Sequence, residues 1–340
     1  MTDPSNTAKK PRPTLKTIAY MTGLGVTTVS RALADAPDIG TKTKERVRAV
    51  ARDIGYRPNR AGVRLRTGKT HVISFILNLE REVLGSTIHL IQGLSRGLGG
   101  TPYHLIVTPS TPEREDLSAV RYVVETGSAD GIILSGIEPQ DPRAAFLHSQ
   151  KFPFVTHGRP GLGQPTACVD FDNEAFALRA TQKLHALGRS RLAIIAPPQK
   201  YAYAKHMLDG FHTVLDAHDL MEIPLRDITS EDPRAQIIDE VARILQSRHR
   251  PDGIVCATVM STIAAVTAIE AAGLTVGEDI DIVAKEPYDF LRSLRGAIHV
   301  IHEDLFQAGW DMAQTMLKLL EGAAPETLQI LHAPDTPDGG

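Results

Sequence analysis

Two short stretches carry residue types that could do catalytic chemistry. Residues 93–97, GLSRG, match the Gly-x-Ser-x-Gly pattern in which a serine nucleophile lies on a turn between a strand and a helix. The preceding STIHLIQ has the apolar spacing of a helix, so we expect Ser95 on a helix surface. Residues 66–70, RTGKT, resemble the end of a phosphate-binding loop, but Val63 stands where that loop requires glycine. Neither stretch predicts an enzyme.

Thirteen histidines and two cysteines raise the questions of a metal site and a disulfide. Pairs such as His206 and His212 do not fall at the i, i+4 spacing, and no cysteine or carboxylate cluster completes a tetrahedral set of ligands. Cys168 and Cys256 lie in apolar runs, which is typical of buried thiols in a reducing compartment. We therefore expect no metal, no other cofactor and no disulfide.

A third stretch, residues 26–33, VTTVSRAL, offers hydroxyl and guanidinium groups but little to a hydrophobic core. As a helix it would have one narrow apolar face, formed by Val29, Ala32 and Leu33. The other faces would carry Thr27, Thr28, Ser30 and Arg31. The stretch therefore predicts a short helix that presents most of its surface to a partner.

The charge of the chain is divided between a basic N-terminal part and an acidic remainder. Residues 1–70 hold 15 Lys and Arg against 5 Asp and Glu, a balance of +10, whereas the remaining residues hold 22 against 35, a balance of −13. A basic part attracts a polyanion, and an acidic body is repelled by one. Residues 1–13, rich in Pro, Lys, Thr and Ser, are expected to be a disordered basic tail.

The basic part has the pattern of three short helices. Apolar residues recur at helical spacing from Leu15, glycines at positions 23 and 25 interrupt the chain, and VTTVSRAL follows. The segment TKTKERVRAVARDIGY predicts a third helix, whose inward face is formed by Val47, Val50, Ala51 and Ile54. Two short helices joined by a glycine-containing turn and closed by a third predict a helix-turn-helix domain over residues 14–58.

The same residues resemble the head of the lactose/galactose repressor (LacI) family. The TVSR core, the IGYRPN turn and the NRxxxxLRTGKT tail follow in the family's order and spacing. The resemblance implies that Val26, Thr27 and Arg31 read the major groove, where the fork of Arg31 could meet O6 and N7 of a guanine. The alternative is that Arg31 only pairs with phosphate. Contacts to the DNA backbone are implied for Thr14, Lys16, Thr28, Ser30, Asn59 and Arg60.

Residues 59–70 are predicted to be a hinge helix and linker. The segment NRAGVRLR is too short to be a stable helix alone in water, so it should fold only under special conditions. The family resemblance supplies the condition. It implies that the hinge folds on operator DNA in a dimer, with Leu65 wedged into the minor groove and with Arg64 and Arg66 supplying positive charge there. Gly62 stands where the family has alanine, which lowers the expected stability of this helix. The alternative is a plain basic linker.

Residues 71–333 alternate apolar runs with amphipathic segments, which predicts parallel sheets covered by helices. Two such series occur, and with 42% apolar residues the chain can build two α/β lobes. The resemblance implies a periplasmic-binding-protein-like body whose chain crosses between the lobes three times. We expect the first lobe over residues 71–167 and 303–323, and the second over 168–302 and 324–333. Residues 334–340 are expected to be a tail.

Candidate ligand-binding residues follow the predicted strands, because ligands of open α/β sheets bind at the carboxyl ends of the strands. Planar polar groups and aromatic faces suit a sugar. The candidates are Asn78, His157, Arg159, Tyr201, Lys205, Thr258, Lys285 and Glu286. Asp172 also follows a strand, but capping the next helix explains it equally well.

The candidate pocket departs from the family pattern at three places. Thr258 and Val259 replace an Asn-Asp pair, Ala284 to Glu286 replace Gly-Tyr-Asp, and Met207 replaces an arginine. Lys285 and Lys205 could restore the lost positive charge. The pocket therefore cannot be copied from the lactose or purine repressors, and the lysine after this strand resembles the α-glucoside-responsive members of the family.

The expected protein is a dimeric transcriptional regulator, in first choice a repressor, that binds palindromic operator DNA and whose affinity is controlled by a sugar or glycoside. No run approaches the ~20 apolar residues of a membrane span, and no signal core opens the chain, so a cytoplasmic, nucleoid-associated protein is expected. The alternative is a sugar-binding protein or an enzyme with an accessory basic head.

Overall fold

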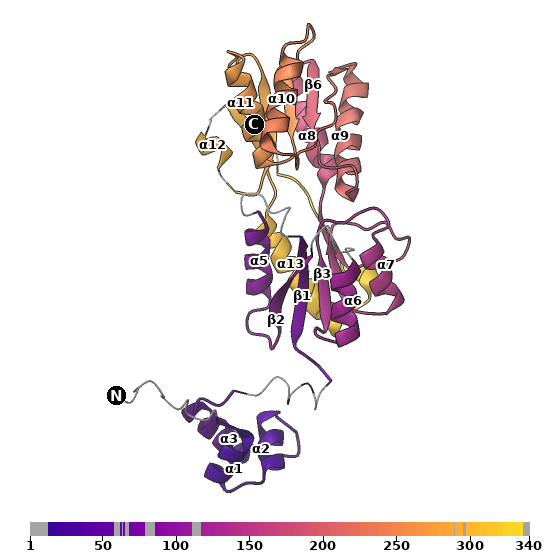
Figure 1. Ribbon diagram of the computed structural model, residues 1–340. Coiled ribbons are helices and arrows are strands. Elements are labelled where there is room, and N and C mark those ends of the chain that lie inside the picture. The colour runs from indigo at the N-terminus through magenta and orange to yellow at the C-terminus, as the bar shows by residue number, and fades with distance from the viewer. Residues whose placement is uncertain are drawn as a thin grey trace, which may run out of the picture. The chain divides into compact units, whose positions relative to one another are not determined.

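The structure, a computed structural model, describes residues 13–57, 62, 64, 68–78, 86–110, 117–288, 290–294 and 297–335. The chain divides into two units, residues 1–70 and residues 71–340 (Figure 1). Each unit has its own hydrophobic core.

The first unit contains the three predicted helices, α1 (Leu15–Thr22), α2 (Val26–Leu33) and α3 (Thr41–Asp53). Thr14 caps α1, since its hydroxyl oxygen accepts from the backbone N–H of Thr17 at 3.3 Å. Gly23 ends α1 in the left-handed conformation, at φ 67°, which glycine adopts without a steric penalty. The three helices bury one small core, formed by Ile18, Ala19, Val29, Ala32, Val47 and Ala51. The helix-turn-helix prediction is confirmed.

The first sheet of the second unit has six parallel strands in the order β11-β5-β4-β3-β1-β2. Its strands are β1 (Val72–Asn78), β2 (His104–Ser110), β3 (Gly131–Leu134), β4 (Phe154–His157), β5 (Cys168–Phe171) and β11 (Gln329–His332). Alternate residues of β1 serve the two faces of the sheet. Ile73 and Phe75 pack with α5 (Ser86–Gly97) and α13 (Leu305–Leu320), while Ile76 packs with α6 (Leu117–Thr126) and α7 (Pro142–Ser149).

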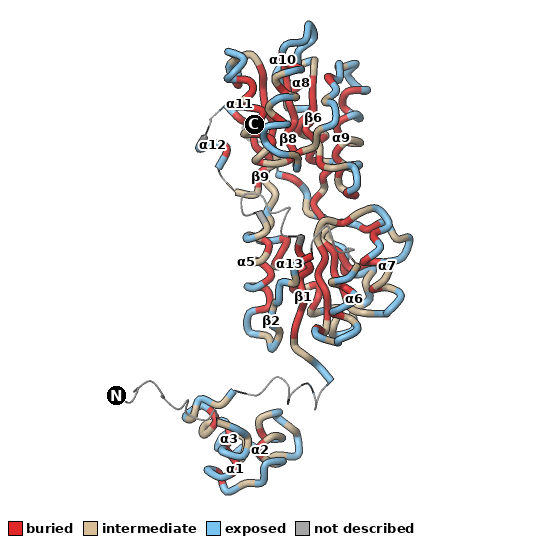
Figure 2. Tube along the Cα trace, viewed as in Figure 1, coloured by how far each residue is buried: buried red, intermediate tan, exposed pale blue. Residues whose placement is uncertain are grey.

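The second sheet has five parallel strands in the order β10-β9-β8-β6-β7. They are β6 (Arg191–Ile195), β7 (Met221–Glu222), β8 (Gly253–Cys256), β9 (Asp281–Glu286) and β10 (Ile298–His302). The associated helices are α8 (Asn173–Ala186), α9 (Ala202–His218), α10 (Arg234–Leu245), α11 (Val259–Ala271) and α12 (Leu291–Leu294). In both sheets the central strands are buried and the helices cover them (Figure 2). The prediction of two α/β lobes is confirmed, although β7 and β10 were not predicted.

The lobe assignment of two strands is corrected. We expected Cys168 to open the second lobe and the last strand to return to it, but β5 and β11 both pair within the first sheet. The reason lies in the packing of β5 at the boundary between the lobes. Val169 belongs to the core beneath α5 and α13, whereas Phe171 belongs to the core beneath α8 and α9. A buried strand is apolar whichever of the two sheets it joins, so the sequence pattern could not show to which sheet β5 belongs.

The chain passes between the lobes after β5 and after β10, and beyond β11 it returns to α8 of the second lobe. The resemblance implied three passages, but the third was expected before the last strand and not after it. The first two passages open helices with aspartate caps: Asp172 accepts from the N–H of Ala175 at 3.0 Å, and Asp304 accepts from the N–H of Gln307 at 2.8 Å. Asp172 is thus a helix cap. The third passage follows β11, where Arg179 of α8 donates to the carbonyl oxygen of Pro334.

The GLSRG stretch lies on α5, as predicted, and Ser95 is exposed on the helix surface. Its two glycines face α13. A Cβ atom at Gly93 would lie 2.0 Å from the carbonyl oxygen of Phe306, and one at Gly97 would lie 2.7 Å from the Cβ of Ala313. The motif therefore serves the close approach of two helices, and its serine is incidental to that role.

Candidate functional site

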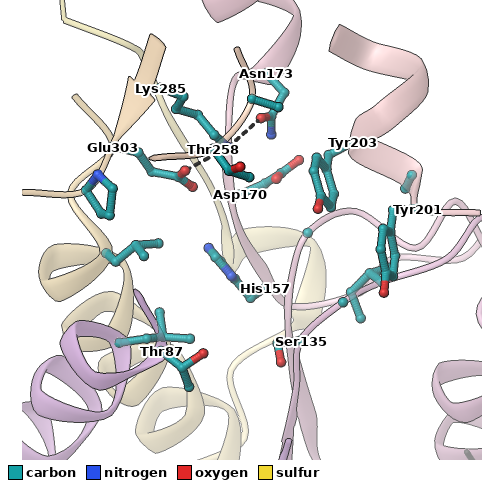
Figure 3. Close-up of a pocket in the computed structure, with 18 of the residues that line it drawn as sticks. Thr87, Ser135, His157, Asp170, Asn173, Tyr201, Tyr203, Thr258, Lys285 and Glu303 are labelled. Carbon is teal, nitrogen blue, oxygen red and sulfur yellow. Dashed lines mark hydrogen bonds and ion pairs between the residues drawn. The ribbon is translucent and has the colours of Figure 1, made fainter. Parts of the chain in front are cut away.

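A cavity of about 270 Å³ lies in the second unit, and the carboxyl ends of strands from both sheets line it (Figure 3). From the first sheet come Leu77, His157 and Asp170, at or near the ends of β1, β4 and β5. From the second sheet come Thr258, which follows β8, and Lys285 near the end of β9. The parallel strands place these side chains together because their carboxyl ends face the same space.

Lys285 pairs with a carboxylate and with an amide oxygen beside this cavity. Its ammonium nitrogen lies 2.8 Å from a carboxylate oxygen of Glu303 and donates to the side-chain oxygen of Asn173 at 3.0 Å. It also lies 5.3 Å from the ring centre of Phe171 and 5.6 Å from that of Tyr203, within range of cation–π attraction. The side chains of Lys285 and Glu303 are each only 12% exposed. Neighbouring side chains therefore surround this ion pair, and water screens the attraction between its charges only weakly.

Two titratable groups beside Lys285 have shifted pKa values. Burial would raise the pKa of Glu303, but the positive charge of Lys285 and the nearby His157 outweigh it, and the pKa is lowered. Burial lowers the pKa of His157 below the ordinary 6.5, against the opposing effect of Glu303 and Asp170. His157 is therefore neutral at pH 7, with one ring nitrogen as donor and the other as acceptor.

The two arginines of the cavity wall are paired with carboxylates. Arg159 donates to Asp170 at 2.7 Å and approaches His206 at 3.4 Å. Arg143 lies 2.6 Å from Asp141 and also donates to the backbone carbonyl of Gly136 at 2.8 Å. Together with the Lys285–Glu303 pair, these contacts neutralise the three Arg and Lys side chains that line the cavity among the residues the structure describes.

An aromatic wall stands at the beginning of α9. The rings of Tyr201 and Tyr203 stack at 5.5 Å with an angle of 11° between them, and Figure 3 shows both at one side of the cavity. The Tyr201 hydroxyl donates to Glu231 at 3.5 Å. The backbone N–H of Ala202 donates to the carbonyl of Ile137 at 3.0 Å, which ties this wall to the loop after β3. Flat rings beside paired polar groups suit a ligand with apolar faces and hydroxyl edges.

Five of the eight candidate ligand-binding residues line the cavity: His157, Arg159, Tyr201, Thr258 and Lys285. Thr258 is also the cap of α11, where it accepts from the N–H of Ser261 at 3.1 Å. Asn78 ends β1, but its side chain lies outside the described part of the structure. The polar lining residues that sequence reasoning missed are Thr87, Ser135, Arg143, Asp170, Asn173, Tyr203, His206, Glu231 and Glu303. Glu303 directly follows β10, so predicting that strand would have nominated it by the same rule.

Lys205 and Glu286 are corrections, because neither is among the residues that line the cavity. Lys205 is one helical turn into α9 on the outer side, where its 75% exposed side chain pairs with Asp209 at 2.5 Å. Glu286 alternates with Lys285 along β9 and is fully buried, accepting from the backbone N–H groups of Phe290 and Leu291. A strand sends successive side chains to opposite faces, so only one of the two neighbours could face the ligand space.

The first unit exposes the polar faces of α2. Val26, Thr27 and Arg31 are exposed, whereas Thr28 and Ser30 are partly buried. The two predicted contacts on α1, Thr14 and Lys16, are also exposed. Of the hinge, Gly62 and Arg64 are described, and both are helical and exposed. The predicted contacts Asn59, Arg60, Leu65 and Arg66 lie outside the described residues.

A helix-turn-helix unit joined to a two-lobed α/β body with a cavity between its sheets defines a ligand-controlled DNA-binding protein. The family model described as "Bacterial regulatory proteins, lacI family" matches residues 14–59. The model described as "Periplasmic binding proteins and sugar binding domain of LacI family" matches residues 89–331. The chain belongs to the LacI family of bacterial transcriptional regulators.

Individual relatives agree with this assignment. The HTH-type transcriptional regulator RafR of Escherichia coli is 32% identical over 94% of this chain and 96% of its own. Two solved structures share the fold. One is the CelR regulator in complex with cellobiose, with a TM-score of 0.69, 23% identity and coverage of 95% of this chain and 98% of that one. The other is the Lac repressor dimer bound to operator and an anti-inducer, with a TM-score of 0.81, 21% identity and coverage of 96% and 98%.

The prediction of a DNA-binding transcriptional regulator that is not an enzyme is confirmed by these relatives. Both cysteines are free and buried, and burial raises the pKa of Cys168 to about 11 and that of Cys256 to about 12. Within the described ranges, no cluster of three His, Cys, Asp or Glu side chains could hold a metal ion. No described helix has the length and apolar content that crossing a membrane requires.

Proposed function

We propose that this regulator binds an uncharged sugar or glycoside in the cavity between its sheets. The observation that carries the proposal is the wall itself, in which paired polar groups face the stacked rings of Tyr201 and Tyr203. Hydroxyl groups of a sugar can exchange hydrogen bonds with His157 and Asp170, while one ring face packs on Tyr203, which is partly exposed and is backed by the buried ring of Tyr201. The family model names a sugar-binding domain, and the CelR relative binds cellobiose. The lysine on β9 keeps the α-glucosides as the first class to test.

The charges of the wall favour an uncharged ligand over a sugar phosphate or a sugar acid. Arg143, Arg159 and Lys285 each have a carboxylate within 2.8 Å. An anion would have to displace one of these carboxylates and leave it without its partner, which is costly in a site screened from water. A neutral polyol can bind through hydrogen bonds alone and leaves these ion pairs in place.

A thermal-shift screen of the purified protein tests this proposal. Neutral mono- and disaccharides, including α-glucosides, are compared with their phosphates at equal concentration. A ligand that binds only the folded state raises Tm, by an amount that grows with its concentration above Kd. We expect one neutral sugar to raise Tm by several degrees and its phosphate to have no effect. A shift with phosphorylated sugars alone would refute the neutral class.

We propose that Val26, Thr27 and Arg31 read bases in the major groove. Their exposure on α2, beside a narrow packed face, supports this role. Contacts to the DNA backbone are proposed for Thr14, Lys16, Thr28, Ser30, Asn59 and Arg60, and minor-groove contacts for Arg64, Leu65 and Arg66.

An Arg31→Ala variant should lose affinity mainly for DNA sites that contain the base pair read by Arg31. Equal weakening on all DNA would show that Arg31 contacts phosphate only.

We propose that the protein acts as a homodimer on palindromic DNA. β2 is an edge strand of the first sheet and exposes Ile106 and Val107, and α5 exposes Ile88 on the neighbouring helix. Exposed apolar side chains on an unpaired edge strand mark a surface that another chain can cover. In this proposal the sugar changes the relative orientation of the lobes, and so the spacing of the two hinges, which releases the operator. Comparing operator affinity with and without the sugar found in the screen tests whether the sugar releases the operator or strengthens its binding.

A further inference from the structure

The reading helix α2 has one acidic neighbour that the proposed DNA contacts do not use. Asp38 lies seven residues beyond Arg31, and its carboxylate is 2.6 Å from a guanidinium nitrogen of Arg31. The loop between them folds back on the end of α2, since the N–H of Ala36 donates to the carbonyl of Arg31 at 3.0 Å. The N–H of Ile39 then donates to the carbonyl of Ala36 at 3.2 Å. This backbone turn carries Asp38 to the arginine.

The other acidic residue of the same loop has different partners. Asp35 lies 3.0 Å from the ammonium of Lys44 and 2.7 Å from the guanidinium of Arg48, both on α3. These two cations lower the pKa of Asp35, with the hydrogen bond from Lys44 as the largest cause. The two carboxylates of the loop thus pair with different helices. Asp35 joins the loop to α3, and Asp38 meets the residue proposed to read a base.

Contact with Asp38 leaves Arg31 able to bind DNA. The guanidinium has five N–H donors in a planar fork, and the side chain remains 53% exposed. A free arginine side chain has many rotamers and pairs readily with any phosphate. A carboxylate at one edge of the fork restricts those rotamers. It also adds a negative charge that repels the phosphate backbone, so both effects favour a base edge over phosphate.

We propose that Asp38 is a positioning residue for DNA recognition, which orients the guanidinium of Arg31 and reduces its attraction to phosphate. The inference rests on the proposed base-reading role of Arg31. In this proposal Asp38 contributes to specificity for one base pair. The Lys and Arg side chains of the first unit other than Arg31 provide the general affinity for DNA.

The test uses the full-length protein and a DNA site selected by the unaltered protein from a random double-stranded pool. Affinity is then measured for this site and for its single-base-pair variants at one salt concentration. Arg31→Ala identifies the base pair that Arg31 reads. Asp38→Asn should reduce discrimination at that same base pair by about fivefold, the upper range for one exposed ion pair. It should also steepen the salt dependence of binding to random DNA by about one unit of slope, because Arg31 becomes free to contact phosphate.

Asp35→Asn is the matched control, because it removes the same charge from the same loop and leaves the Arg31–Asp38 pair intact. It should preserve discrimination at the base pair read by Arg31. In the Arg31→Ala background, Asp38→Asn should change that discrimination no further. Circular dichroism of each variant verifies that the head is folded, and Asp38→Glu should recover part of the loss if Asp38→Asn is unstable.

Three outcomes would overturn the proposal. Unchanged discrimination in folded Asp38→Asn would show that the pair does not orient Arg31. An equal loss in Asp35→Asn would show that loop charge alone is responsible. A uniform loss on all DNA in Arg31→Ala would remove the base-reading role itself, which separates failure of the proposed function from failure of this inference.

Discussion

Lys285 joins two of the three passages between the lobes. Its partner Asn173 is the first residue of α8, directly after the first passage, and its partner Glu303 opens the second passage. The same ammonium faces the cavity. A ligand that alters the hydrogen bonds of Lys285 therefore acts on the segments about which the lobes would reorient, which couples the chemistry of one residue to the proposed movement.

Replacing Lys285 should abolish the response to the effector. In Lys285→Gln, removal of one partner of a weakly exposed ion pair is expected to lower the free energy of unfolding by about 3 kcal/mol. The sugar that raises Tm of the unaltered protein should then give no shift. The measurement is a thermal-shift titration of both proteins with that sugar.

Lys205→Gln is the control for this substitution, since Lys205 is an exposed lysine of α9 that pairs with Asp209 outside the cavity wall. It should keep both its stability and its response to the sugar. A normal sugar-induced shift in Lys285→Gln would contradict the assignment of Lys285 to the ligand site.

His157 should make stability depend on pH below neutrality. Because burial lowers its pKa in the folded protein, the unfolded chain binds this proton more readily. The free energy of unfolding is therefore unaffected by His157 above the unfolded value, about pH 6.5, and decreases as the pH falls towards the lower folded value. Glu303, whose pKa is also lowered, adds a further loss of the same sign at more acidic pH.

Thermal unfolding between pH 7.5 and 5.5 checks this prediction. His157→Asn should show a smaller fall of Tm over that range than the unaltered protein. His249→Asn, at an exposed position after α10, serves as a control for the loss of one histidine and should behave like the unaltered protein. An equally steep fall of Tm in His157→Asn would contradict the assigned cause.

At the scale of elements, glycines set the distance between paired helices. Gly93 and Gly309 allow α5 and α13 to meet, and Gly210 allows α9 to approach α8. A Cβ atom at Gly210 would lie 2.1 Å from the carbonyl oxygen of Glu174. Both helix pairs border the cavity, because its lining includes Leu90 of α5, Leu305 of α13, Asn173 of α8 and Tyr203 of α9.

Gly210→Ala should destabilise the body although alanine favours helices. The added methyl group meets backbone atoms of α8, so the two helices must separate, at a cost of about 3 kcal/mol. Asp216→Ala, at an exposed position of the same helix, makes a comparable change of propensity without this clash and should leave stability nearly unchanged. Denaturant unfolding of the two variants measures the difference. Equal stability would show that α9 moves away without cost.

At the scale of the whole molecule, the two edges of the first sheet are expected to differ. β2 exposes Ile106 at 44% and β11 exposes Leu331 at 49%, and at the β2 edge Val107 of β2 and Ile88 of α5 are exposed as well. Ile106→Asp should convert the proposed dimer into a monomer of 36.9 kDa in light scattering, because a charge would be buried in the interface. Leu331→Asp should leave the mass of the dimer unchanged. A dimeric Ile106→Asp would place the interface elsewhere.

The sequence by itself determined most elements of this protein and their class, although not β7 and β10. Local spacing decides where a helix or a strand forms, and the division of charge at residue 70 separates a DNA-seeking head from an acidic body. The cap at Asp172, the helix under GLSRG and five of the candidate cavity residues followed from the same local rules.

The tertiary structure alone decided which sheet receives β5 and β11, which face of β9 points to the cavity, and which partner each charge has. These are long-range choices, made by packing between segments that lie far apart in the chain. Lys285 and Glu286 show the physical reason most clearly. Both follow the same apolar run, but the pleat of the strand turns one to the cavity and buries the other.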